Sequence, residues 1–223
     1  RVRRGRGRVR GGLLVSAVRS DITFTSRGVR CAAWQVQATS DELIRDGRRP
    51  CAVIAHGFGA TRDTALMGFA EEFADAGIDS FVFDYRTFGA SAGTPRQVVS
   101  CRMQRQDYCI PLAAQPGSVA VLATPAALEG YQASGGPTWR NEVCARTSLE
   151  VAFNRPITRA AQVTCPMLVQ IGSDDRVAPP DAARTAARRA GGPITVLKYP
   201  VDHFDVYAGP WQAKTLADEV DFL

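Results

Sequence analysis

Two acids and a histidine near the C-terminal end of the chain have the spacing of groups that could activate a nucleophile. Asp174 and Asp175 come soon after the apolar run 165–171. His203 comes soon after the next apolar run, 194–199. An acid that orients a histidine, with the histidine as general base, is two thirds of a nucleophilic triad. The plainer alternatives are a turn that leads into a helix for the acids and a surface loop for His203.

A glycine-containing loop earlier in the chain could supply backbone donors. It has the sequence His56-Gly57-Phe58-Gly59 and follows the apolar run 52–55, which is typical of a buried parallel strand. Glycines let the backbone turn sharply and approach a ligand closely. The N–H groups could hold a phosphate or stabilise an oxyanion. The oxyanion is favoured because the chain has neither Gly-x-Gly-x-x-Gly nor a P-loop lysine there, and a turn without a ligand is the remaining alternative.

The elements that would position these residues alternate along the chain. Residues 21–26 and 29–38, joined by Arg27-Gly28, are expected to form an N-terminal antiparallel hairpin. Strands are then predicted at 52–55, 78–83, 165–171 and 194–199, and helices at 61–76, 182–190 and from Pro210. This order predicts an α/β fold with a mostly parallel sheet and helices on both faces. Parallel strands bring their carboxyl ends, and so these residues, to one edge.

The middle of the chain breaks this order. Thr94-Pro95 is typical of a helix start, and we expect a helix from about Pro95 to Asp107. Residues 108–164 are rich in proline and glycine and show no clear strand–helix–strand unit. This is long for an irregular connection, so the fold is expected to be incomplete in the middle.

Four motifs together resemble the α/β-hydrolases, close to the esterase and serine-aminopeptidase-like members. They are His56-Gly57-Phe58-Gly59, the segment 84–91 (DYRTFGAS), the segment 172–179 (GSDDRVAP) and the segment 199–204 (YPVDHF). The order of glycine loop, acid and histidine is also that of the family. The resemblance covers about residues 20–108 and 160–223. It implies a single α/β-hydrolase-like domain over residues 20–223.

The resemblance also implies roles for individual residues. Phe58, with Gly57, would supply the oxyanion N–H donors, and His203 would be the triad base. Asp175 would be the triad acid in preference to Asp174, because it stands two residues before Val177 as in the family's Asp-x-Val pattern. His56 would shape its loop and take no part in the reaction.

The nucleophile is where the chain departs from the family. The literal Gly-x-Ser-x-Gly match places Ser91 in the loop after the Asp-Tyr-Arg strand, where the family's serine is structural. Ser118 lacks the second glycine, and Cys109 is a weak alternative. The family's elbow strand, its helix and the next strand would fall near residues 108–111, where there is no room for them. Either a natural deletion or an omitted segment would explain this, and the open strand edges should weaken the chain or recruit a partner.

We therefore predict a hydrolase of ester or small acyl substrates that needs no cofactor. The alternative is a non-catalytic relative, truncated in the middle, that acts as a binding or interaction module. Catalysis requires a reactive serine or cysteine, whereas the alternative predicts none.

Charge and composition bound the remaining possibilities. The net charge of +5 falls to −1 once the six arginines of residues 1–10 are subtracted, so the basic charge belongs to an arm, residues 1–19, that is expected to be disordered. We do not expect nucleic acid as a partner, although salt-dependent binding through this arm is a weaker alternative.

Six cysteines without metal-binding spacing and two histidines predict no metal site and a reduced, cytoplasmic protein. No run is long enough to span a membrane, and the oligomeric state is left open.

Overall fold

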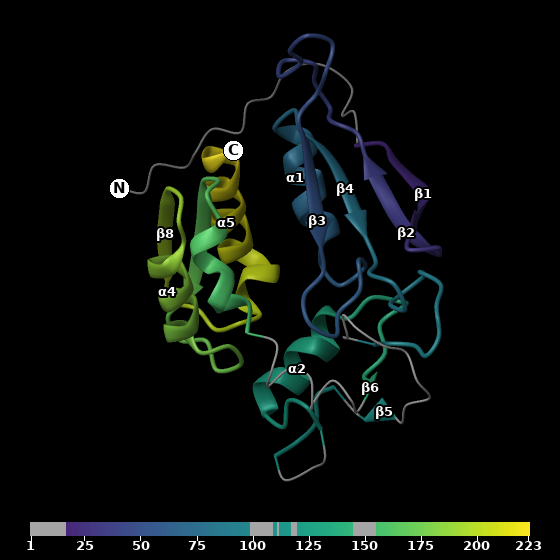
Figure 1. Cartoon of the computed structure of the whole chain (residues 1–223), viewed down its shortest axis with the longest axis vertical. Coiled ribbons are helices and arrows are strands. Elements are labelled where there is room, and N and C mark those ends of the chain that lie inside the picture. Colours follow the sequence, from purple (N-terminus) through teal and green to yellow (C-terminus); the bar gives the residue numbers. More distant parts are fainter. Residues whose placement is uncertain (1–16, 99–108, 111, 117–119, 145–154) are drawn as a thin grey trace.

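The first part of the chain forms a four-stranded sheet, whose strands lie in the order β1 (Arg19–Ser26), β2 (Val29–Val36), β4 (Asp79–Phe83) and β3 (Cys51–Ala55) (Figure 1). The computed structural model describes residues 17–98, 109–110, 112–116, 120–144 and 155–223. Strands β1 (Arg19–Ser26) and β2 (Val29–Val36) are antiparallel, as predicted. Arg27 and Gly28 between them have φ of 48° and 78°, and positive φ at both central residues is characteristic of the tight hairpin turn. Of the predicted arm, residues 1–16 lie outside the described residues.

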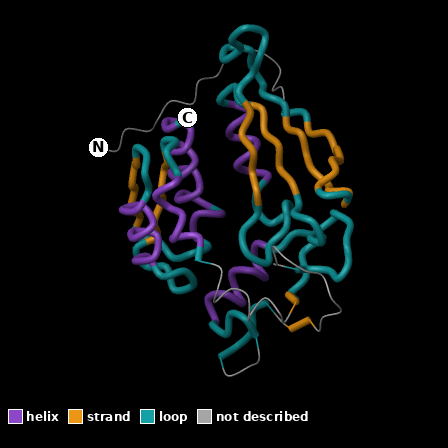
Figure 2. Tube along the Cα trace, in the orientation of Figure 1, coloured by secondary structure: helices purple, strands orange, loops and turns teal. Residues whose placement is uncertain are grey.

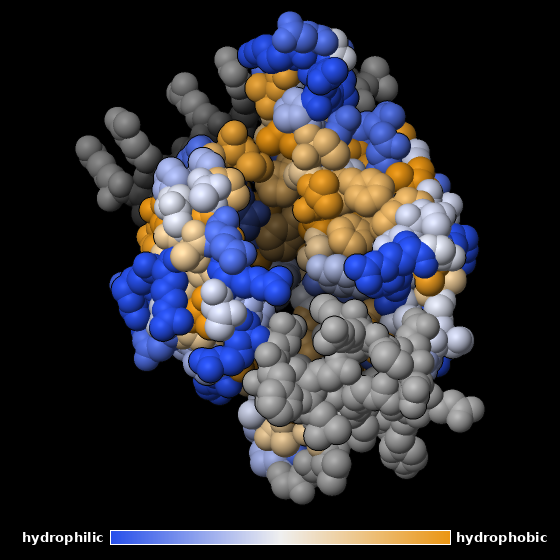
Figure 3. Space-filling view, in the orientation of Figure 1, coloured by the Kyte–Doolittle hydropathy of each residue, from blue (hydrophilic) through white to orange (hydrophobic). Residues whose placement is uncertain are grey.

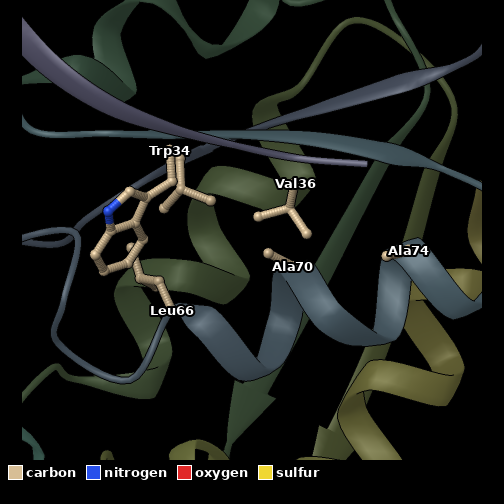
Figure 4. Packing of buried hydrophobic residues seen from close by; sticks show 6 residues of the cluster. Trp34, Val36, Leu66, Ala70 and Ala74 are labelled. Carbon is tan, nitrogen blue, oxygen red and sulfur yellow. The ribbon is translucent and has the colours of Figure 1, made fainter. Parts of the chain in front are cut away.

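A parallel unit completes this sheet. Strand β3 (Cys51–Ala55), helix α1 (Met67–Asp75) and strand β4 (Asp79–Phe83) follow one another, and β3 and β4 pair in parallel. Strand β4 also pairs antiparallel with β2. Helix α1 packs on one face of the sheet, where the buried cluster consists of Trp34, Val36, Leu66, Ala70, Ala74 and Val82 (Figure 4).

A second parallel pair lies in the C-terminal part. Strands β7 (Met167–Gly172) and β8 (Ile194–Tyr199) pair in parallel and are connected through helix α4 (Pro180–Arg189). Two short helical segments, η1 (Pro156–Gln162) and η2 (Asp205–Tyr207), and the C-terminal helix α5 (Gly209–Phe222) complete this part. Helix α5 contacts both α1 and β7, so it joins the two parts (Figure 2).

The middle of the chain is more ordered than the sequence predicted. Helix α2 (Pro125–Ser134) lies within it, and the two-residue strands β5 (Cys109–Ile110) and β6 (Val143–Cys144) pair antiparallel. The Thr124 hydroxyl caps α2 by accepting the N–H of Ala127 at 3.2 Å. The predicted helix start at Pro95 is wrong, because residues 95–98 are not helical; residues 99–107 lie outside the described part.

A second buried cluster gathers the carboxyl ends of the strands against α2. Its buried members are Ala60, Leu112, Ala113, Ala127, Tyr131 and Val143. Phe58 after β3, Val177 after β7 and Phe204 after β8 pack against it. The loops that follow three strands therefore meet at one edge of the fold. None of the helices in the described part of the chain is long and apolar enough to cross a membrane.

Candidate active site

Asp175 and His203 lie in hydrogen-bond contact at this edge. The distance between His203 Nδ1 and Asp175 Oδ2 is 2.8 Å. Both side chains are partly buried, with 28% of His203 and 14% of Asp175 exposed. The loops after β7 and β8 thus bring together the acid and the base that the resemblance implied. The neighbouring Asp174 is held through its backbone N–H, which donates to the Val201 carbonyl at 3.2 Å.

Backbone donors fix the orientation of the Asp175 carboxylate. Its Oδ1 accepts the N–H of Val177 at 2.8 Å and the N–H of Ala178 at 2.7 Å. These bonds leave Oδ2 for His203. If Nδ1 carries the proton and donates to Asp175, Nε2 is left as an acceptor, which is the form of a general base. Within the described residues, no side chain is hydrogen-bonded to Nε2.

The glycine loop after β3 has a conformation that requires one of its glycines. Gly59 has a φ of 67°, and a Cβ there would lie 2.3 Å from Cδ2 of Leu112. The Gly57 carbonyl accepts the N–H of Ala60 at 3.2 Å, which closes a tight turn. The N–H groups of Gly57 and Phe58 donate to no other residue in the described part of the chain. They can therefore donate to a ligand, and their oxyanion role stays a prediction.

Tyr131 from α2 holds this loop, and the sequence analysis did not identify it. Its hydroxyl donates to the Phe58 carbonyl at 2.6 Å. Its ring stacks on Trp139 with 6.0 Å between centroids and meets Phe204 edge-on at 5.2 Å. Burial raises the pKa of Tyr131 to about 12, so the hydroxyl stays a donor at neutral pH. The Thr-Pro pair at 124–125, a helix N-terminus signal, could have located α2.

His56 is a buried part of the loop. Its Nδ1 lies 3.0 Å from the Gly57 carbonyl, and its Nε2 accepts the N–H of Tyr85 at 3.3 Å. Burial lowers the pKa of His56, which favours the neutral ring that these two contacts require. Both ring nitrogens are used within the fold, as expected of a loop-shaping residue.

Ser91 is also committed to the fold. It is buried, and its hydroxyl accepts the N–H of Ala32 at 2.9 Å and donates to the Asp84 carbonyl at 2.9 Å. The hydroxyl thus ties β2 to the loop after β4, and the structure does not bring it to His203. The side chains of the other two candidates, Ser118 and Cys109, lie outside the described residues.

The buried carboxylate of Asp84, the first residue of the 84–91 motif, organises the same region, a role that the sequence analysis did not predict. It accepts the N–H of Arg62 at 2.7 Å and that of Ala90 at 3.0 Å. Burial raises the pKa of Asp84, while these two hydrogen bonds and the Arg62 guanidinium at 3.5 Å oppose that rise. A side chain at Gly89 would collide with the carboxylate, since its Cβ would lie 2.4 Å from Oδ2.

Comparison with solved structures identifies the architecture. The α/β hydrolase GrgF from Penicillium sp. sh18 superposes with a TM-score of 0.75 at 16% identity, covering 92% of this chain and 97% of that one. The fold is that of the α/β-hydrolases. Within this α/β-hydrolase fold, the esterase Pf2001 of Pyrococcus furiosus gives a TM-score of 0.56 at 13% identity, covering 93% and 92% of the two chains.

No protein-family model matches the chain. The quorum-quenching protein AidA of Acinetobacter baumannii is 25% identical over 292 residues, which cover 91% of this chain and 93% of AidA. This alignment is longer than the 223 residues of the chain. AidA therefore has residues at positions where this α/β-hydrolase-like chain has none.

Proposed function

We propose that the chain acts as a hydrolase of ester or small acyl substrates through a nucleophile–His203–Asp175 mechanism. The observation that carries this proposal is the 2.8 Å contact between Asp175 and His203 at the carboxyl ends of parallel strands. The glycine loop at the same edge, with two N–H groups that donate to no described residue, supports it. The fold shared with an esterase is consistent with this reaction class.

In the proposed mechanism His203 carries the proton at each step. Its Nε2 would accept the proton of the nucleophile while the oxygen or sulfur of the nucleophile bonds to the acyl carbon. The negative charge on the former carbonyl oxygen would then face the N–H groups of Phe58 and Gly57. The imidazolium, stabilised by ionised Asp175, would give its proton to the leaving group. Water, deprotonated by His203, would then attack the acyl carbon, and the imidazolium would return the proton to the departing nucleophile as the acid is released.

The nucleophile stays unassigned. Ser91 is the unfavourable choice because both hydrogen bonds of its hydroxyl go to backbone groups. Ser118 and Cys109 remain candidates. The non-catalytic alternative differs from the proposal in one measurable respect, since it predicts no turnover by a folded chain.

Hydrolysis of p-nitrophenyl acetate and butyrate by the purified chain tests the proposal. His203→Ala is expected to reduce kcat/KM by about 10³-fold or more, because the general base is removed. Asp175→Asn is expected to reduce it by about 10²–10⁴-fold, although the new amide oxygen can still accept the Val177 and Ala178 N–H groups.

A matched control is Arg184→Ala, which removes an ion pair with Asp181 within α4. It should hydrolyse both esters at the wild-type rate. Absence of turnover by a folded wild-type chain, or undiminished turnover by both site variants, would rule out the proposed mechanism.

A further inference from the structure

Asp202, directly before His203, accepts one backbone N–H next to each member of the Asp175–His203 pair. Its Oδ1 accepts the N–H of His203 at 2.8 Å. The same oxygen accepts the N–H of Arg176 at 2.9 Å, and Arg176 directly follows Asp175. One carboxylate oxygen therefore holds the peptide group of the base and the peptide group next to the acid.

The other oxygen of Asp202 binds the Arg176 side chain. The guanidinium approaches Oδ2 through Nε at 2.6 Å and Nη2 at 2.5 Å. Arg176 is 73% exposed and Asp202 only 20%. Because exposed ion pairs contribute little to stability, the value of this contact lies in the geometry that it imposes on the two loops.

Asp202 is itself held from the other side. Its N–H donates to Asp205 Oδ2 at 2.8 Å, and the Asp205 N–H donates to the Asp202 carbonyl at 3.3 Å. These bonds fix the turn 202–205, which contains His203 and leads into η2. The Asp202 carboxylate thus projects from a turn of defined shape.

The charge on Asp202 is maintained by its partners. Burial alone would raise the pKa of this carboxyl, but the N–H groups of Arg176 and His203 and the Arg176 guanidinium outweigh burial and lower it. Asp202 is therefore an ionised, acceptor-only group at neutral pH. The carboxylates of Asp175 and Asp205 and the ring of His203 are the other titratable groups bonded to this turn or across it.

The strand ladder does not extend to the candidate pair. Its last bonds are Ser173 N–H to the Tyr199 carbonyl at 2.8 Å and Asp174 N–H to the Val201 carbonyl at 3.2 Å. Beyond them, the described hydrogen bonds between the loops are those of Asp175 with His203 and those of Arg176 with Asp202. Without the second set, a single partly exposed bond would set the separation of acid and base.

We propose that Asp202 and Arg176 are positioning residues, which lock the loop after β7 to the loop after β8 so that Asp175 Oδ2 meets His203 Nδ1. Neither residue contacts the reacting atoms in the proposed mechanism. This Asp202–Arg176 link between the two loops is a geometric feature of the chain, and only its effect on turnover rests on the proposed hydrolase function.

The ring of His203 reports this link directly. The chain has two histidines, so long-range ¹H–¹⁵N spectra of histidine-labelled protein contain two rings, and His203→Ala assigns them. In the wild type, His203 is expected to show a single tautomer with the proton on Nδ1, because Asp175 accepts from that atom. In Asp202→Ala, a mixture of both tautomers is expected. Arg184→Ala should match the wild type.

Two milder variants test the backbone contacts and the guanidinium contact of Asp202 one at a time. They also provide a test of the proposal if Asp202→Ala does not fold. Asp202→Asn keeps an oxygen for the two N–H groups but loses the charge that binds the guanidinium. Arg176→Ala keeps both backbone bonds. Each should show a smaller admixture of the second tautomer than Asp202→Ala, and Asp202→Asn should restore most of the wild-type signal.

Kinetics distinguish the link from the hydrolase function. For p-nitrophenyl acetate, Asp202→Ala is expected to lower kcat by about tenfold with little change in KM, since acid and base are misplaced while substrate contacts remain. A shifted tautomer in Asp202→Ala with no turnover in the wild type would support the link and reject the hydrolase. A wild-type tautomer in both Asp202→Ala and Arg176→Ala, or a mixture in the wild type itself, would overturn the link.

Discussion

Three aspartates near the strand ends have different roles because their oxygens have different partners. Asp84 accepts backbone N–H groups in a fully buried position, and Asp175 divides its oxygens between two N–H groups and the His203 ring. Asp202 joins the loops on which Asp175 and His203 lie. Distinct surroundings thus give one residue type a structural, a candidate reactive and a positioning role.

Glu219 on α5 provides a prediction about pH and stability. It lines an open, mainly apolar hollow of about 360 Å³ with Phe73, Leu168 and Phe222 among its neighbours, and burial raises its pKa to about 7. In the unfolded chain the Glu219 carboxyl loses its proton near pH 4.5, whereas in the fold it keeps the proton up to about pH 7. The free energy of unfolding should therefore fall as pH rises from about 4.5 to 7. Glu219→Gln should remove that fall and be more stable than the wild type at pH 8, by about 1 kcal/mol after allowing for partial exposure.

Thermal unfolding of both proteins between pH 4.5 and pH 8 measures this effect. The exposed acid Glu72 on α1 supplies the control Glu72→Gln, which should follow the wild-type curve. Parallel curves for Glu219→Gln and the wild type would show that the buried carboxyl does not govern the pH dependence.

Strand-end position predicted that Asp174 or Asp175 would lie near His203, and the Asp-x-Val pattern of the α/β-hydrolases selected Asp175. The order of apolar runs placed Asp175 and His203 after neighbouring parallel strands, and the structure has them 2.8 Å apart. The role of Asp202 could not be predicted in this way. It depends on where two backbone N–H groups of separate loops point, and no residue type encodes that.

At the scale of elements, helix α2 is the part of the middle region that shapes the candidate site. Its residue Tyr131 reaches the Phe58 carbonyl from a helix more than sixty positions further along the chain. The helix is held by the same cluster that receives Val177 and Phe204. The glycine loop, the acid loop and the base loop therefore share one support.

Tyr131→Phe tests that support. Loss of the hydroxyl removes its bond to the Phe58 carbonyl and leaves that carbonyl without this donor, which should cost about 1 kcal/mol of unfolding free energy. We expect kcat/KM for p-nitrophenyl acetate to fall about three- to tenfold, because the predicted oxyanion donor at Phe58 becomes less well placed. Tyr85→Phe, at a half-exposed tyrosine, is the control. Equal activity of Tyr131→Phe and the wild type would show that the hydrogen bond from α2 does not influence the reaction.

Local hydrogen bonds explain where the prediction of elements was wrong. The helix expected from residue 61 begins at Met67, because the Thr61 N–H donates to the Thr64 hydroxyl and Ala65 has a φ of 56°. Gln97 has a φ of 57°, and its N–H donates to the Thr87 carbonyl, so no helix starts at Pro95. Strands β3, β4, β7 and β8 were predicted because their apolar runs are short, contain β-branched or aromatic residues and lie next to proline or glycine.

At the scale of the whole molecule, two strands with the sequence of central strands lie at sheet edges. In the described part of the chain, β3 pairs only with β4, and β7 only with β8. The apolar residues of β3 would be buried on both faces in a central position, yet Val53 is 70% exposed. Figure 3 shows apolar side chains gathered over β3 and β4, beside a hollow that faces the β7–β8 part.

Val53 lies on the face of the sheet opposite α1. Its neighbour Ile54 packs towards α1 with the first cluster, and successive side chains of a strand alternate between faces. Val53 pairs with Phe81, which contacts Phe24 and Phe83. An exposed apolar face beside an open strand edge favours association with other chains.

Val53→Lys should therefore reduce self-association. We expect weaker light scattering and weaker binding of the dye bis-ANS, with the unfolding free energy within about 0.5 kcal/mol of the wild type because an exposed side chain is replaced. Val196→Lys, at an exposed valine of β8, is the control and should leave both signals nearly unchanged. Equal reductions in the two variants would mean that charge alone, and not this face, governs association.

The most direct test of the proposed mechanism is labelling of the purified chain with a fluorophosphonate, read by intact mass. The account predicts one adduct on the 24.0 kDa chain, lost in His203→Ala, with peptide mapping to identify the residue that carries it. A folded chain of that mass that forms no adduct would exclude a serine nucleophile, and a chain whose adduct persists without His203 would contradict the proposal that Asp175 and His203 activate a nucleophile.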